Sequence, residues 1–95
     1  MAQATRVGDL NTGHGSYRPV PLVSGSNNVI INGKLSGRIN DTYATHCAPN
    51  SGCHIDIVSQ GSSTVLINGR RAARVGDQTG AAKVAQGSNN VIIGG

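Results

Sequence analysis

The sequence predicts an all-β fold of three hairpin repeats, and two recurring motifs carry this prediction. The first motif begins with Gly-Ser, continues with two small polar residues and three aliphatic residues, and ends in Asn-Gly or Gly-Gly. It occupies residues 25–33, 61–69 and 87–95. Val and Ile favour strands, and Asn-Gly favours a tight hairpin turn. Self-similar segments of this kind indicate a repeat architecture.

The second motif consists of an arginine, an aliphatic residue, a turn-prone residue and an aspartate, at residues 6–9, 38–41 and 74–77. In the two repeats that contain both motifs in full, the arginine follows the first glycine by 13 residues. The distance from each arginine to the next Gly-Ser instead varies between 13 and 23 residues. The hairpins therefore have a fixed length, and the variable loops follow the aspartates. We expect each arginine to pair with the aspartate of its motif.

The elements follow in order from these motifs, within a single domain of residues 1–95. No stretch has helical periodicity, and two prolines and several glycines exclude a helix from the first loop. We expect an opening strand at 2–7, a loop at 10–21, a hairpin at 28–39, a loop at 41–57, a hairpin at 64–75, a loop at 76–86 and a strand at 90–93.

Composition limits both the core and the partners. The chain has no Phe or Trp, so Val, Ile, Leu and Ala must form a thin core, and small domains of this kind usually need a staple. The net charge is +4, but the basic residues are spread over the repeats without interleaved aromatic residues, which predicts no nucleic-acid binding. Residues 1–11 do not resemble a secretory signal, and no apolar run is long enough to span a membrane.

All the histidines and cysteines lie in the two longer loops, a clustering that predicts a metal site. Three imidazoles and one thiolate are a suitable tetrahedral set for zinc. His14 and His46 each stand five residues after the aspartate of the second motif, so the repeats should bring them towards a common axis. The equivalent place in the third repeat is Ala81 or Ala82, which cannot bind a metal. The remaining ligands should therefore come from the second loop, which offers Cys47, Cys53 and His54.

Three alternatives compete with a structural metal site. A Cys47–Cys53 disulfide would remove both thiols, although cytoplasmic thiols are more often ligands. A catalytic Cys53–His54 pair is disfavoured because adjacent residues seldom align as nucleophile and base. A zinc hydrolase would need an open metal position and a general base, for which only Asp56 is near. Four available ligands favour a closed site, so we expect no enzyme; a free-standing metal-binding module is the remaining possibility.

The segment 61–77, which joins one Gly-Ser motif to Arg-Ala-Ala-Arg-Val-Gly-Asp, resembles the PAAR-repeat family. The family is named after a Pro-Ala-Ala-Arg tetrapeptide, whose first residue is Arg71 here, and the resemblance extends over essentially the whole chain. It implies a small cone of three pseudo-threefold hairpin repeats with a metal-stapled tip, which holds zinc rather than iron. The implied ligands are His14, His46 and His54. Family members often carry a cysteine after the third Gly-Asp, where this chain has Thr79-Gly80-Ala81, so Cys53 is our fourth ligand and Cys47 the alternative.

The resemblance also implies a partner and a location. PAAR-repeat proteins cap a trimeric β-helical spike in contractile phage tails and in type VI secretion, so the resemblance implies this role here. The sequence does not distinguish between these two systems. We expect one copy per spike trimer, no self-association, synthesis in the cytoplasm, and transient contact with a target membrane that the tip pierces. Aliphatic residues that alternate onto one face are the candidates for the docking base: Val29, Ile31, Val65, Ile67, Val91 and Ile93.

Overall fold

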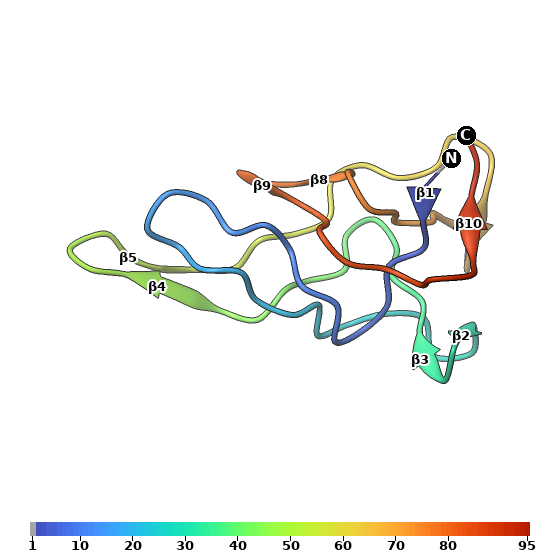
Figure 1. The fold of residues 1–95 in the computed structure, drawn as a ribbon, viewed down its shortest axis with the longest axis horizontal. Coiled ribbons are helices and arrows are strands. Elements are labelled where there is room, and N and C mark those ends of the chain that lie inside the picture. Colours follow the sequence, from blue (N-terminus) through green and yellow to red (C-terminus); the bar gives the residue numbers. More distant parts are fainter. Residues whose placement is uncertain (1) are drawn as a thin grey trace.

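The computed structural model describes residues 2–95 and contains no helix in that range, which confirms the all-β prediction. No element in the described chain is therefore a candidate helical membrane span. Short strands pair into antiparallel two-stranded sheets (Figure 1). The strands are β1 (Ala2–Gln3), β2 (Ile30–Ile31), β3 (Lys34–Leu35), β4 (His46–Ala48), β5 (Gly52–His54), β6 (Leu66–Ile67), β7 (Arg70–Arg71), β8 (Gln78–Thr79), β9 (Ala82–Lys83) and β10 (Ile92–Ile93).

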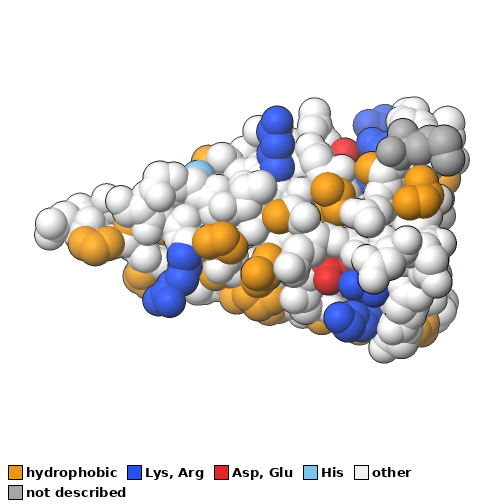
Figure 2. Space-filling view, viewed as in Figure 1, with side chains coloured by type: hydrophobic (Ala, Val, Ile, Leu, Met, Phe, Trp, Pro, Cys, Tyr) orange, Lys and Arg blue, Asp and Glu red, His pale blue; other side chains and the backbone are white. Residues whose placement is uncertain are grey.

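The molecule is an elongated cone that measures 39 × 24 × 22 Å along its principal axes. Figure 2 shows the taper from a broad end to a narrow point. The broad end contains β1, β10, β2 and β3, and the narrow end is the β4–β5 hairpin (Figure 1). The predicted second loop thus contains a hairpin, and the predicted third loop contains another, β8–β9. Asn50, in the turn between β4 and β5, has φ 60°, a left-handed conformation that asparagine tolerates.

The broad end is a ring of three equivalent strand pairs, closed by the two ends of the chain. Sheets β2–β3 and β6–β7 each form from one hairpin, whereas β10 takes its partner from the start of the chain, with Ala2 opposite Ile93. Three isolated bridges then join each pair to the next: Ala4 to Arg74, Ser36 to Arg6, and Ala72 to Arg38. The N-terminal strand therefore completes the third repeat.

The recurring Gly-Ser is required by close backbone packing in this ring. A Cβ atom on Gly25 would lie 2.8 Å from the carbonyl oxygen of Ser36, and the glycines at 61 and 87 have the same kind of neighbour at 2.8 and 2.7 Å. The hydroxyl of buried Ser26 accepts hydrogen bonds from the backbone N–H groups of Asn28 and Val29, at 3.2 and 2.9 Å. The serines at 62 and 88 accept the equivalent bonds. Both residues of the motif thus fix the entry into a strand.

The predicted arginine–aspartate pairs are confirmed in all three repeats. Arg6 donates from Nε and Nη2 to the two carboxylate oxygens of Asp9, at 2.9 and 3.1 Å, and hydrogen bonding to Asp9 raises the pKa of Arg6. Its Nη1 also donates to the side chain of Asn32 in the adjacent hairpin turn, at 3.1 Å. The arginines at 38 and 74 make the same fork to their aspartates and reach Asn68 and the carbonyl of Gly94. Each arginine therefore ties one repeat to the next.

The core lies in two clusters along the cone axis. Val20, Leu22, Tyr43, Val58, Ala73 and Val84 fill the middle of the body. Ala4, Ile31, Ile67, Ala72 and Ile93 fill the ring, with Val29 and Val91 packed against them. Three of the candidates for the docking base, the isoleucines at 31, 67 and 93, face into the ring, whereas Val65 is 36% exposed. Strand side chains alternate, so each of the three outer strands also carries one exposed apolar residue: Ile30, Leu66 and Ile92.

Adjacent isoleucines provide a direct test of this assignment. Ile31 is 9% exposed and Ile30 is 54% exposed. We expect Ile31→Asp to lower the free energy of unfolding by about 3 kcal/mol or more, because it places an unpaired charge in the ring core. The matched control Ile30→Asp should stay within about 0.5 kcal/mol of the wild type. Thermal unfolding followed by circular dichroism measures both, and similar losses in the two variants would contradict the burial pattern.

Candidate metal centre

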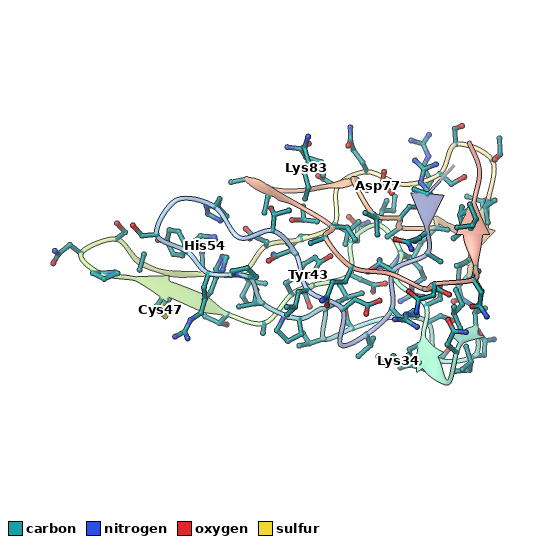
Figure 3. All side chains as sticks on the ribbon, in the orientation of Figure 1. Lys34, Tyr43, Cys47, His54, Asp77 and Lys83 are labelled. Carbon is teal, nitrogen blue, oxygen red and sulfur yellow. A yellow bond between two sulfur atoms is a disulfide. The ribbon has the colours of Figure 1, made fainter. Side chains whose placement is uncertain are left out.

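The β4–β5 hairpin places two histidines side by side near the narrow end of the cone. Its register pairs His46 with His54 and Cys47 with Cys53. Because successive strand residues point to opposite faces, the two histidines share one face and the two cysteines share the other. Figure 3 shows His54 and Cys47 on this hairpin. The cysteines form a disulfide.

The third histidine comes from the first loop. His14 and Tyr17 bridge each other across a tight turn. A side chain on the preceding residue, Gly13 (φ 67°), would come within 2.5 Å of the Tyr17 carbonyl oxygen, so the turn requires glycine there. The Tyr17 ring lies against all three imidazoles, with centroids 4.2–4.9 Å apart, and its hydroxyl donates to the Ser51 carbonyl at 2.9 Å. Tyr17 therefore holds the first loop against the β4–β5 hairpin.

The fourth member of the cluster is Asp56, which follows β5. Its carbonyl accepts a hydrogen bond from the Tyr43 N–H at 3.0 Å, which fixes the backbone against the second repeat. Its side chain is buried, and it runs so close to Gly80 that a Cβ atom there would lie 3.3 Å from Oδ1. The carboxylate is thereby directed at the histidines.

The four side chains converge at distances that suit one tetrahedral ion. The Nε2 atom of His54 lies 3.0 Å from that of His14 and 2.9 Å from that of His46. Asp56 Oδ2 lies 3.4 and 3.2 Å from the Nε2 atoms of His14 and His46, and Oδ1 lies 3.1 Å from that of His54. Ligands about 2.0–2.1 Å from a tetrahedral metal lie about 3.3–3.4 Å from one another. His14, His46, His54 and Asp56 are thus positioned to hold a metal ion.

Proton placement supports the same conclusion. His46 Nδ1 lies 2.8 Å from the carbonyl oxygen of Arg18, which can only accept, so Nδ1 carries the proton and Nε2 presents a lone pair. A proton on His54 Nε2 could bridge only one of its two imidazole neighbours. Asp56 Oδ2 is buried and accepts no hydrogen bond from any described residue. A metal ion at the centre of the cluster would use the lone pair on His46 Nε2 and the unpaired Asp56 oxygen.

The structure brings together three of the four residues that the sequence indicated as ligands: His14, His46 and His54. It does not bring Cys53 to them, because the Cys53 sulfur is bonded to Cys47 on the opposite face. Asp56 occupies the fourth place. Two signals in the sequence point to this arrangement. Residues 46–54 are nearly palindromic, with His-Cys at one end and Cys-His at the other, which indicates a hairpin. Asp56 stands two residues after His54, and residues two apart in a strand lie on the same face.

Four protein side chains around one ion fill a tetrahedral shell. Catalytic zinc sites keep one position for water or substrate, whereas structural sites are closed. Here His14 comes from the first loop, and His46, His54 and Asp56 come from the second. A bound ion would therefore cross-link two repeats near the point of the cone.

A family model described as PAAR motif matches residues 12–82 and again residues 56–95. The two matches overlap, and together they extend from the first loop to the end of the chain. No curated protein matches the chain at a significant level.

Two substitutions distinguish the carboxylate from the thiols. Asp56→Ala should weaken metal binding by more than the about 10–100-fold typical of losing an outer-shell partner. The double variant Cys47→Ser/Cys53→Ser should keep its metal and lose only the disulfide contribution, about 2 kcal/mol for so short a loop. Competition with a chromophoric chelator measures affinity, and thermal unfolding measures stability. If the cysteine variant loses its metal while Asp56→Ala retains it, a thiolate is the ligand.

Proposed function

This chain belongs to the PAAR-motif family, and we propose that it is the metal-stapled tip that caps a trimeric β-helical spike in a contractile injection machine. Members of this family have a structural rather than an enzymatic role. In this proposal the broad end docks on the spike and the narrow end meets the target membrane first. Residues 1–95 act as a single cone, with one copy per spike trimer and no self-association.

The observation that carries this proposal is the set of three unpaired strand edges at the broad end. All the described sheets are two-stranded, but the isolated bridges between pairs involve the segments that follow β1, β3 and β7, which leaves β2, β6 and β10 with an unpaired outer edge. Figure 1 shows β2 and β10 further towards the broad end than their partners β3 and β1. Unpaired edges offer backbone N–H and C=O groups to another β structure. Three pseudo-equivalent edges match a threefold spike, which a single chain can cap only by imitating its symmetry.

Apolar side chains accompany these edges. Each of the three strands carries one exposed aliphatic residue: Ile30, Leu66 and Ile92. Their equivalent positions in the three repeats would let a threefold partner bury all of them at once. Removal of this apolar surface from water would favour association.

Zinc is the ion that best suits the narrow end. Three imidazole nitrogens and one carboxylate oxygen form a typical zinc ligand set, and a closed shell makes the ion structural. Neither apolar cluster includes a residue of the β4–β5 hairpin. A metal cross-link can hold this thin region together, where few side chains can be buried.

A zinc hydrolase is not supported by this geometry. Asp56 is the acidic residue that would have to act as its general base. The Asp56 carboxylate instead lies against the three histidines, as a ligand would. Phage tails and type VI secretion both fit the proposal, with the tip on a virion or exported by the machine from the cytoplasm.

The first test concerns the metal. The purified protein should contain about one zinc per chain and should unfold at lower temperature in chelator. Acid should have the same effect, because protons compete with the metal for the imidazoles, so stability should fall as the pH falls. Elemental analysis and thermal unfolding check both statements. A metal-free protein whose thermal stability is unchanged by chelator would disprove the staple.

The second test concerns the partner. The protein should form a complex with a candidate trimeric β-helical spike. Size-exclusion chromatography with light scattering should give the mass of one chain per spike trimer. Leu66→Asp should weaken this complex at least about tenfold, because it buries a charge at the docking edge, while the zinc content stays the same. Ile57→Asp is the matched control, since Ile57 is also exposed but lies in the second loop, outside the ring. A complex of three chains per trimer, or an equal effect of both variants, would refute the cap.

A further inference from the structure

Three buried polar side chains occupy equivalent positions in the three repeats. Asn11, Tyr43 and Thr79 each stand two residues after the aspartate of the second motif. Their exposed fractions are 1%, 1% and 0%. The sequence gives these positions no common residue type, so their shared burial is a property of the fold.

Backbone pairing places the three residues at one height along the cone. The N–H groups of Asn11 and Tyr43 donate to the carbonyls of Val20 and Asp56, both at 3.0 Å, and Thr79 pairs with Ala82. The next backbone hydrogen bonds towards the broad end are also equivalent. Each runs from an N–H group to the backbone carbonyl of a motif aspartate at 2.9 Å: Leu22 to Asp9, Val58 to Asp41 and Val84 to Asp77. The three strand pairs are therefore in register around the axis.

Each of these side chains has a polar atom that lacks a hydrogen-bond partner among the described residues: Asn11 Nδ2, Tyr43 OH and Thr79 Oγ1. The orientation of the Asn11 amide is fixed, because its Oδ1 accepts from the N–H groups of Gly13 and Val20, both at 3.1 Å. A buried polar atom without a partner costs about 1–3 kcal/mol. Three such atoms in one layer require a common explanation.

The Tyr43 side chain packs in a buried cluster with Leu22, Val58 and Val84, which come from all three repeats. Burial raises its pKa, and the charges of Asp9, Asp56 and Asp77 raise it further. These carboxylates come from the segments after all three ring strand pairs, so the hydroxyl is within electrostatic reach of all three. Figure 3 shows Tyr43 in the body of the cone, between the His54 end and the broad end.

We propose that Asn11, Tyr43 and Thr79 bind one water molecule on the pseudo-threefold axis, in the layer next to the metal centre. The Asn11 amide donates to the water, and the water donates to both hydroxyls, which can rotate to accept. A buried water typically makes about three hydrogen bonds, the number available here. Thr79 and Ala82 are the smallest of the three residue pairs in this layer.

The donor set excludes a charged ligand. An anion would find no cationic side chain in this layer and would be repelled by the neighbouring carboxylates. A cation would face the fixed N–H group of Asn11 and only two neutral hydroxyl oxygens, too few for a hard metal ion. Water accepts one bond and donates others, and so fits both kinds of partner.

The water site is separate from the metal ligands. Asp56 belongs to this layer through its backbone, but its carboxylate is directed at the histidines. Removal of the water should therefore leave the metal in place. The inference does not depend on the spike partner or on the identity of the metal.

Oxygen-17 magnetic relaxation dispersion on the metal-loaded full chain tests the site, because it counts internal waters with long residence times. The double variant Tyr43→Phe/Thr79→Val should contain one long-lived water fewer than the wild type, with unchanged metal content. Ser26→Ala is the matched control: Ser26 also has a buried hydroxyl in the ring, but its hydrogen bonds are all made to Asn28 and Val29. This control should keep every long-lived water.

A crystal structure gives the second readout. We expect a density peak about 2.7–3.2 Å from Asn11 Nδ2 and from both hydroxyl oxygens. An unchanged water count in the double variant would overturn the proposal, as would direct donation from Asn11 Nδ2 to either hydroxyl in the crystal. If the double variant does not fold, Thr79→Val alone decides, because the loss of one bond should shorten the water's residence time at least tenfold, and an unchanged time would refute the site.

Discussion

The pairing of the first strand with the last is the constraint on which the rest of the cone depends. Without β1, the strand β10 would have no partner, and the ring would be open at one of its three joints. The closed ring sets the spacing of the three segments that leave it towards the point. His14 and His46 stand at the same distance along two of these segments, and so the ring determines where the candidate metal ligands meet.

The interior changes in character as the cone narrows. Isoleucines from three repeats fill the ring, a mixed group around Tyr43 fills the body, and histidines with one carboxylate occupy the region near the point. This order follows from geometry, because an apolar core needs enough cross-section for side chains to bury one another. Where the cone is too thin for burial, directional polar and metal bonds can hold the chain together, since each needs only a few atoms.

The repeats could be predicted from the sequence because each has a strong local cause. Gly-Ser marks a close backbone contact, Asn-Gly marks a reversal, and each arginine bonds to an aspartate three residues away. The direction of the aliphatic face could not be predicted, since both Ile30 and Ile31 are apolar and only ring closure decides which one faces the axis. The identity of the fourth candidate ligand depended on how the strands pair within residues 46–54. An irregular loop could have brought Cys53 to the histidines, whereas the hairpin turns it away.

The contact between the two chain ends also has a topological meaning. The third copy of the first motif ends in Gly94-Gly95, where the other copies have the reversals Asn32-Gly33 and Asn68-Gly69. Ala2 lies opposite Ile93, and Figure 1 shows β1 beside β10 at this place. The linear chain is thus one of three nearly equivalent ways to open a single circular path. A permuted chain that joined the present ends and began after either Asn-Gly would trace the same strands through the same neighbours, with only its starting point moved around the ring.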